Sequence, residues 1–241
     1  GVEFAGFYGH SAQDVRAMLE ECGLRAVSSN VALKLIEADM QGVIDYHKAI
    51  GCDYIAVPYL SAEQRPGTPA FAGVLRTIYQ FGCLCRDNGI QLLYHNHDFE
   101  FVSFSGMYAL DFLYAAMPED VLKTEIDVCW VKYAGEDPAA YLRRYAGRAP
   151  VVHLKDFVGR KEGDAAPYGL LGQSETKAAG EVPFEFRPVG YGCQDVSAVA
   201  EAGLDAGAKW FVVEQDASVG RTPLEAAAMS IDTLRKIGLK G

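Results

Sequence analysis

Short apolar runs alternate with longer amphipathic stretches along the whole chain. The short runs have the composition of parallel strands that are buried on both faces. They predict strands at Val2–Phe4, Arg25–Ser29, Tyr54–Pro58, Gln91–Asn96, Leu122–Val128, Val151–Lys155 and Trp210–Glu214. Between the runs, apolar residues recur at helical spacing. This spacing predicts helices at Ala12–Cys22, Ala38–Ile50, Ala70–Asn88, Tyr108–Ala116, Pro138–Tyr145, Asp195–Ala206 and Thr222–Ile237.

The boundaries between these elements follow a repeated pattern. A helix, a glycine and then a strand occur in that order at Gly23, Gly51 and Gly207. Repetition of this unit at roughly 25–35 residues is typical of a βα barrel, and neither all-α nor all-β folds produce it. An open doubly wound sheet is the structural rival, but no G-x-G-x-x-G phosphate turn follows any strand. The sequence therefore predicts an α/β fold, a (β/α)8 TIM barrel, as a single domain over residues 1–241.

The predicted strands number one fewer than a closed barrel of this type contains. Val2–Phe4 has the position expected of a second barrel strand, with no first strand or helix before it. We therefore expect about one βα unit, on the order of 20–30 residues, to precede Gly1 in the natural protein.

The stretch Val158–Gln194 shows no regular pattern and is rich in glycine, proline and charge. An irregular loop of that length in a compact domain is usually functional. We expect it to act as a lid or a subunit contact, with cations for substrate groups supplied by Arg160, Lys161 and Arg187.

Potential metal ligands stand at the ends of three predicted strands. Asp127, His153 and Glu214 each close or directly follow an apolar run. The carboxyl ends of parallel strands meet at one mouth of a barrel, so these side chains should converge there. Two carboxylates and an imidazole are suitable ligands for a hard-to-borderline divalent cation. We predict that all three bind one common ion.

The strand Gln91–Asn96 runs into a dense group of polar residues. Neighbouring strand residues face opposite sides, so His95 and His97 can share the inward face. We favour His95 as the fourth ligand, with His97 beside it and Glu100 as the nearest available carboxylate. The choice among these three residues stays open from sequence alone.

Composition narrows the range of partners. The net charge of −10 and the pI near 5.0 count against a nucleic-acid partner, because binding to phosphates needs clustered Lys and Arg. No apolar run reaches the roughly 18 residues of a membrane span, and no export signal opens the chain. Six scattered cysteines have neither zinc-finger nor disulfide-scaffold spacing. We read them as reduced residues of a cytoplasmic protein.

Several motifs resemble those of a known superfamily. They are Tyr94–Phe101, Glu125–Trp130, Val152–Asp156, Pro188–Gly192 and Val213–Asp216. In these motifs, and over essentially its whole length, the chain resembles the xylose-isomerase-like TIM barrels. That superfamily includes the sugar phosphate isomerases and epimerases, inosose dehydratase and, more distantly, endonuclease IV.

The resemblance implies a metal site and also shows a departure from it. The ketose epimerases hold one metal with a Glu, an Asp, a His and a Glu at the ends of strands five to eight. Asp127, His153 and Glu214 match the last three positions, whereas His95 stands where the relatives have the first Glu. A symmetric proton exchange between two metal-bound glutamates is therefore in doubt for this chain. Trp130 stands where several epimerases carry a substrate-binding His.

These correspondences lead to predicted roles around the metal. Glu214 or Glu100 is the predicted base, and His97 is expected to affect turnover. Lys155 and Asp156 are placed to bind substrate oxygens or to orient the imidazole of His153. Predicted contacts to substrate also come from Trp130, by stacking on a sugar ring, and from His10 and Arg187.

The function that the resemblance implies is a metal-dependent isomerase or epimerase. It would act on a small sugar, keto-sugar or cyclitol through an enediolate stabilised by Mn²⁺, Co²⁺, Mg²⁺ or Zn²⁺. A lyase or dehydratase acting on a keto-sugar or inosose at the same metal site is the first alternative, and a non-catalytic sugar-binding barrel is another. Phosphodiester cleavage is disfavoured by the net charge. No membrane or nucleic-acid partner is expected, and a homo-oligomer is left open.

Overall fold

The computed structural model describes residues 1–159 and 183–239. Within these ranges the centre of the fold is a seven-stranded sheet with the order β1-β2-β3-β4-β7-β8-β11. Each neighbouring pair in this sheet is parallel. The order follows the chain without reversal, as in a barrel and unlike a doubly wound sheet. The strands are β1 (Val2–Phe4), β2 (Ala26–Asn30), β3 (Tyr54–Val57), β4 (Gln91–His95), β7 (Lys123–Asp127), β8 (Val151–Leu154) and β11 (Trp210–Val213).

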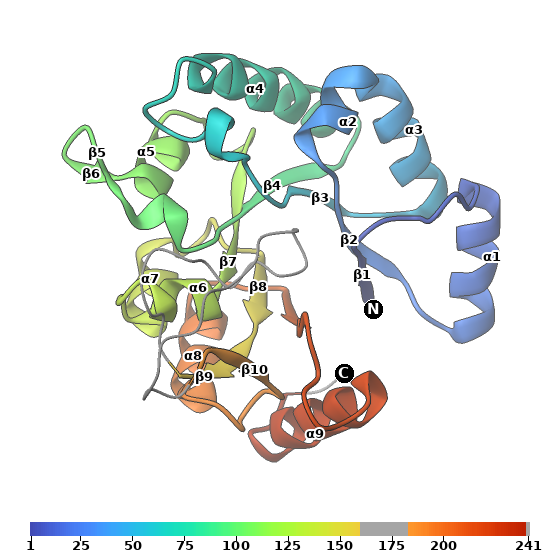
Figure 1. Cartoon of the computed structure of the whole chain (residues 1–241). Helices are drawn as coiled ribbons and strands as arrows, with labels where there is room; N and C mark the ends of the chain where they lie inside the picture. The colour runs from blue at the N-terminus through green and yellow to red at the C-terminus, as the bar shows by residue number, and fades with distance from the viewer. Residues whose placement is uncertain (160–182, 240–241) are drawn as a thin grey trace.

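Helices surround this sheet on its outside (Figure 1). They are α1 (Ala12–Cys22), α2 (Leu33–Ala38), α3 (Met40–Ile50), α4 (Phe71–Asp87), α5 (Ala109–Ala115), α6 (Val128–Tyr133), α7 (Pro138–Arg144), α8 (Val196–Asp205) and α9 (Pro223–Lys236). The predicted strands and helices are all present, with ends that differ by no more than two residues. None of the helices in the described ranges is both long and apolar enough to cross a membrane.

Local chemistry explains where the first helices begin and end. The Ser11 hydroxyl accepts the N–H of Asp14, and the Asp14 carboxylate accepts the N–H of Ser11, so both donors are satisfied at the start of α1. Helix α3 ends at Gly51, whose φ of 70° is the left-handed conformation that glycine adopts without strain. These signals are present in the sequence itself.

The two faces of the strands differ in polarity. Outward-facing residues such as Ile55, Leu92, Ile126 and Val152 belong to the large apolar core that includes helix residues. Because side chains alternate along a strand, the residues on either side of Ile126 point into the barrel. At those positions this chain carries carboxylates, so the interior of the barrel is polar near its mouth.

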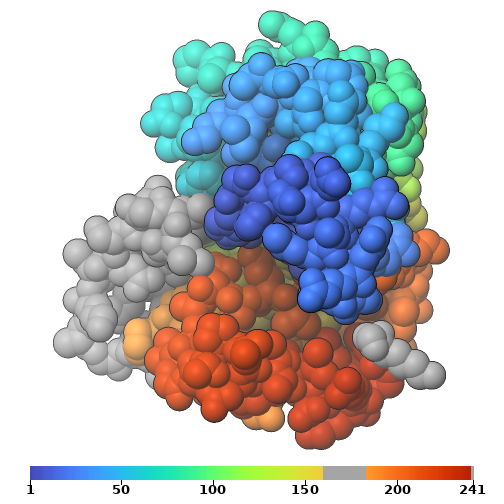
Figure 2. Space-filling view, turned by 90° about the vertical axis from the view of Figure 1, so that its right-hand side faces the viewer, coloured from blue at the N-terminus to red at the C-terminus, as the bar shows by residue number. Residues whose placement is uncertain are grey.

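The sheet has two end strands, β1 and β11, which no ladder joins in the described ranges. A groove of about 610 Å³ lies between them, lined by Val2 and Val27 on one side and by β11, Ile231 and Leu234 on the other. Figure 2 shows this side of the molecule, where the dark-blue N-terminal residues and the red residues of α9 lie on either side of a recess. The expectation of a further βα unit before Gly1 stays a prediction.

Some elements differ from the sequence-based prediction. The prediction that Val158–Gln194 has no regular structure is wrong in the part described after residue 182. There, β10 (Glu185–Arg187) pairs antiparallel with β9 (Asp156–Val158). The pattern also misses two short helices, α2 and α6, and the hairpin formed by β5 (Ser103–Phe104) and β6 (Met107–Tyr108). Arg160 and Lys161 lie outside the described residues, and the proposed lid or subunit contact stays a prediction.

Candidate metal centre

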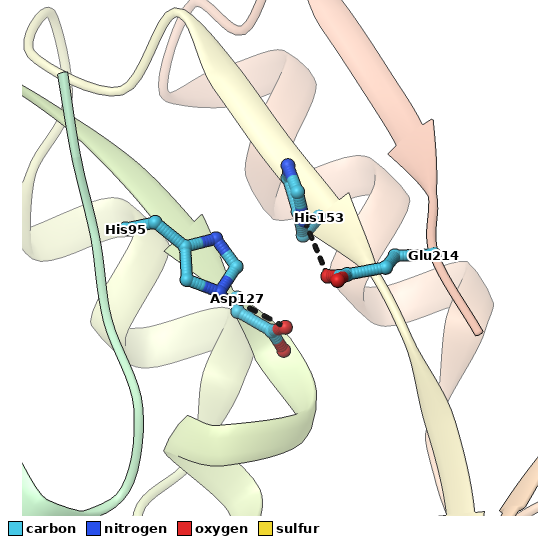
Figure 3. Close-up of side chains that lie close together, drawn as sticks. All are labelled: His95, Asp127, His153 and Glu214. Atoms are coloured by element: carbon cyan, nitrogen blue, oxygen red, sulfur yellow. Dashed lines mark hydrogen bonds and ion pairs between the residues drawn. The ribbon is translucent and has the colours of Figure 1, made fainter. Parts of the chain in front are cut away.

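Four potential ligands meet at the carboxyl ends of four neighbouring strands. His95 is the last residue of β4 and Asp127 is the last residue of β7. His153 lies in β8, and Glu214 directly follows β11. Figure 3 shows the four side chains pointing toward one another across the mouth. The strand order β4-β7-β8-β11 brings them together, because adjacent parallel strands end at the same edge.

The distances within this cluster suit one small cation. One ligand atom from each residue lies within 4.8 Å of the others. His95 Nε2 is 3.7 Å from Asp127 Oδ2, and His153 Nδ1 is 2.8 Å from Glu214 Oε2. Two imidazole nitrogens and two carboxylate oxygens form a donor set typical of Zn²⁺, Mn²⁺ and related ions.

One buried oxygen tests whether a cation fits the cluster. Asp127 is fully buried, yet its Oδ2 accepts no hydrogen bond from the described residues. An unsatisfied buried carboxylate oxygen costs free energy, which a bound cation offsets. Its other oxygen, Oδ1, accepts the N–H groups of Cys129 and Trp130 at the start of α6. These residues therefore fit a divalent cation, with Asp127 held in place by the helix that follows it.

Two further carboxylates lie behind the imidazoles. Glu125 Oε2 is 3.3 Å from His95 Nδ1 and 3.4 Å from His153 Nε2. Glu3 Oε1, from β1, is 3.0 Å from the same nitrogen of His153. Neither residue was identified from the sequence. For Glu125, a usable signal is the alternation of side chains along the strand, which places it on the same inward face as Asp127.

Burial and charge oppose each other at the two imidazoles. Burial lowers the pKa of His95, but its contact with Glu125 and other carboxylates outweighs burial and leaves the pKa raised. Burial likewise lowers the pKa of His153, but the charges of Glu3 and Glu125 outweigh burial and hold the pKa well above its usual range. Burial also raises the pKa of Asp127 to about 6. A cation competes with protons for these atoms, so its binding should weaken as the pH falls.

A buried ammonium group lies beside the cluster. Lys155 Nζ is 2.8 Å from Asp216 Oδ1, 3.3 Å from Glu214 Oε2 and 3.9 Å from Asp127 Oδ2. Burial lowers the pKa of Lys155, but the three carboxylates outweigh burial and raise it, so the side chain stays charged. Burial raises the pKa of Glu214, but the charge of Lys155 outweighs it and holds that pKa well below its usual range.

An aromatic wall flanks the cluster next to His95. The ring of His97 stacks on Phe99 at 5.5 Å and on Trp130 at 5.3 Å. Trp130 also stacks with Phe184 at 6.0 Å. Because Trp130 is buried and its ring already contacts His97 and Phe184, the geometry gives it a supporting position next to His97. Stacking of a sugar on Trp130 stays a prediction that this geometry does not favour.

Glu100 lies apart from the cluster. Its Oε1 accepts the hydroxyl of Tyr94 at 2.6 Å, and its Oε2 accepts the N–H of His97 at 2.8 Å. Burial raises the pKa of Glu100 to about 7. With both oxygens in use, Glu100 is placed to hold the backbone that carries His97. Among the described residues, Glu100 is not part of the group of converging ligands.

Asp156 fixes the loop that carries Gly190 and Gly192. Its carboxylate accepts the backbone N–H groups of Phe157, Gly190, Gly192 and Gln194 at 2.9–3.1 Å. A Cβ at Gly192 would lie only 2.2 Å from Asp156 Oδ1, so the close approach requires glycine. The predicted contact of Asp156 with substrate is untested, and its oxygens are already occupied.

The remaining predicted substrate contacts do not join the cluster. Arg187 pairs with Glu185 at 3.0 Å within β10. His10 is exposed before α1, where its carbonyl accepts the hydroxyl of Tyr46. The roles of Arg187 and His10 stay predictions.

Comparisons with known proteins agree with this architecture. Residues 2–237 match the sequence model of the family described as xylose isomerase-like TIM barrel. None of the curated proteins compared with this sequence gives a significant match.

Three solved structures illustrate the fold. A sugar phosphate isomerase/epimerase from Parabacteroides distasonis has a TM-score of 0.75 at 20% identity, over 97% of this chain and 86% of that one. A xylose isomerase-like TIM barrel protein from Mycobacterium smegmatis, in complex with magnesium, has a TM-score of 0.66 at 17% identity, over 95% and 79% of the two chains. A probable 3-DHS dehydratase from Bacillus anthracis has a TM-score of 0.65 at 12% identity, over 92% and 81%. At these identities the similarity establishes the fold.

Proposed function

The chain belongs to the xylose isomerase-like TIM barrel family, and on that premise we propose that it is a divalent-metal-dependent isomerase or epimerase. The proposed substrate is a small sugar, keto-sugar or cyclitol, and the proposed reaction passes through an enediolate. The observation that carries this proposal is the convergence of His95, Asp127, His153 and Glu214. The similarity to an isomerase/epimerase and to a magnesium-bound barrel supports it.

In the proposed reaction, the metal would stabilise negative charge and one carboxylate would remove a proton. A divalent cation at this site would polarise a substrate carbonyl and stabilise the negative charge that develops when the neighbouring C–H proton leaves. Glu214 is the proposed base, because its side chain is 32% exposed whereas the other three cluster side chains are at most 5% exposed. The low pKa of Glu214 keeps it ionised as a carboxylate.

Two other residues are proposed to handle protons. Lys155 stays charged between Asp216 and Glu214, and we assign it a hydrogen bond to a substrate oxygen. His97 is the proposed second acid/base group, because its ring centroid lies 5.1 Å from that of His95 and burial lowers its pKa. In this proposal, the pair of Glu214 and His97 takes the place of the two metal-bound glutamates of the ketose epimerases, of which this sequence keeps only Glu214.

Hydrogen exchange into substrate tests the proposal. The Mn²⁺-loaded protein is incubated in D₂O with a panel of ketohexoses and an inosose and followed by ¹H NMR. The expected result is replacement of one substrate C–H by deuterium without loss of water. Asp127→Asn should abolish the exchange, whereas Asp120→Asn, an exposed carboxylate in a surface ion pair, should leave it intact. Metal-loaded protein that exchanges no proton of any panel member would contradict the proposal.

A lyase or dehydratase acting on the same keto-sugars is the second candidate. It is favoured by Lys155, a buried ammonium within 3.3 Å of Glu214 that can protonate a departing oxygen. The single carboxylate base also suits elimination, which removes one proton and returns none to carbon. In the same NMR experiment, a lyase gives an unsaturated product with net loss of water, and an isomerase does not.

A further inference from the structure

Glu125 occupies an unusual position behind the proposed metal ligands. It is fully buried, and its Oε2 lies 3.3 Å from His95 Nδ1 and 3.4 Å from His153 Nε2. These are the nitrogens that face away from the cluster. The opposite nitrogens, His95 Nε2 and His153 Nδ1, face Asp127 and Glu214. One carboxylate oxygen therefore reaches the rear of both imidazoles.

We propose that Glu125 is the positioning residue of the metal centre, and that it accepts the non-ligating N–H of both His95 and His153. The proposal rests on the metal centre proposed above. Each imidazole has two nitrogens, and the proton must sit on the rear one for the front one to donate a lone pair. A single acceptor behind both rings fixes that arrangement for both ligands.

The lack of well-formed hydrogen bonds to these atoms among the described residues supports the assignment. His95 Nδ1, His153 Nε2 and Glu125 Oε2 are all buried, and in the described ranges none of them completes a hydrogen bond of good geometry. A buried polar atom left unsatisfied costs free energy. For His95 Nδ1, the carboxylate of Glu125 is the nearest charged partner in the described structure.

Glu3 provides an internal comparison. Its Oε1 lies 3.0 Å from His153 Nε2 and accepts the side-chain N–H of Asn30 at 3.0 Å. Its one close imidazole contact in the described chain is with His153. Loss of Glu3 should therefore affect one imidazole, whereas loss of Glu125 should affect two.

Metal affinity and imidazole NMR test this role without reference to turnover. Zn²⁺ affinity is measured by competition with a chelator, and the ring N–H protons of His95 and His153 are observed in Zn²⁺-loaded protein. Glu125→Gln keeps the shape and removes the charge. It should lower Zn²⁺ affinity by about 10–100-fold, the usual scale for lost outer partners of metal ligands. It should also move both N–H resonances, whereas Glu3→Gln should move that of His153 alone.

A matched control separates this effect from a general loss of stability. Glu136 accepts the hydroxyl of Tyr108 at 2.6 Å, and it is not among the converging ligands of the described chain. Glu136→Gln should leave both the affinity and the resonances unchanged. If Glu125→Gln binds Zn²⁺ as tightly as wild type with both resonances unmoved, the positioning role is wrong and the metal centre stands. If the wild-type protein binds no Zn²⁺, the metal centre itself is overturned, and this role with it.

Discussion

Asp156 should contribute more to stability than to substrate binding. Its buried carboxylate accepts four backbone N–H groups, from Phe157, Gly190, Gly192 and Gln194. Removing the carboxylate leaves these donors without their acceptor. We expect Asp156→Ala to lower the free energy of unfolding by about 3–4 kcal/mol.

The magnitude follows from the number and kind of these bonds. A hydrogen bond to a charged group contributes roughly 1.5–3 kcal/mol. The four bonds share one carboxylate, and the backbone around the two glycines is partly exposed, so water can replace part of what is lost. Single substitutions rarely cost more than about 4–5 kcal/mol. The expected value therefore lies below the sum of the four bonds and above the typical value for one bond.

The assay is urea unfolding followed by circular dichroism, with Asp137→Ala as the matched control. Asp137 accepts two N–H groups at the exposed start of α7, and such a helix cap contributes about 1 kcal/mol. A loss below about 1 kcal/mol for Asp156→Ala, together with a raised KM, would refute the structural role. It would instead support the predicted contact with substrate.

Two other changes should also be measurable. Arg148→Met should cost about 3 kcal/mol in urea unfolding, because its buried guanidinium donates to three backbone carbonyls. Arg143→Met, which loses a half-exposed ion pair with Asp205, should cost less than about 1 kcal/mol. An equal cost for the two would contradict this account. The pKa of Glu100, raised by burial from 4.5 to about 7, means that the folded protein binds a proton that the unfolded chain releases. Roughly 3 kcal/mol of stability should therefore be lost as the pH rises from about 4.5 to 7, and Glu100→Gln should lack this slope when unfolding is compared at about pH 5 and pH 8.

Sequence and structure agree where the physical signal is local. The proposed ligands Asp127, His153 and Glu214 could be picked out because each stands at the end of an apolar run, and parallel strands bring such ends together. Glu125 was missed, because a carboxylate inside a strand conflicts with the expectation that buried parallel strands are apolar on both faces. Its place is intelligible only once His95 and His153 are known to lie on either side of it.

Helix α6 was missed for a related reason. Asp127 is both the last residue of β7 and the cap of α6, so no glycine, proline or polar linker separates the two elements. The apolar residues that follow Asp127 then read as a continuation of the strand. The position of Glu100 depends on its contacts with Tyr94 and the backbone of His97, which no local pattern in the sequence reveals.

The two contacts of the Asp127 carboxylate link metal binding to tryptophan fluorescence. Its Oδ2 faces the other proposed metal ligands, while its Oδ1 accepts a hydrogen bond from the backbone N–H of Trp130. A cation bound to this carboxylate should therefore change the surroundings of Trp130. The indole of Trp130 stacks against His97, and its ring centroid lies 5.3 Å from Lys155 Nζ. The chain has only one other tryptophan, Trp210, in β11. Metal loading should thus change the intrinsic fluorescence of the protein, and Trp130 serves as a built-in reporter that needs neither label nor substrate.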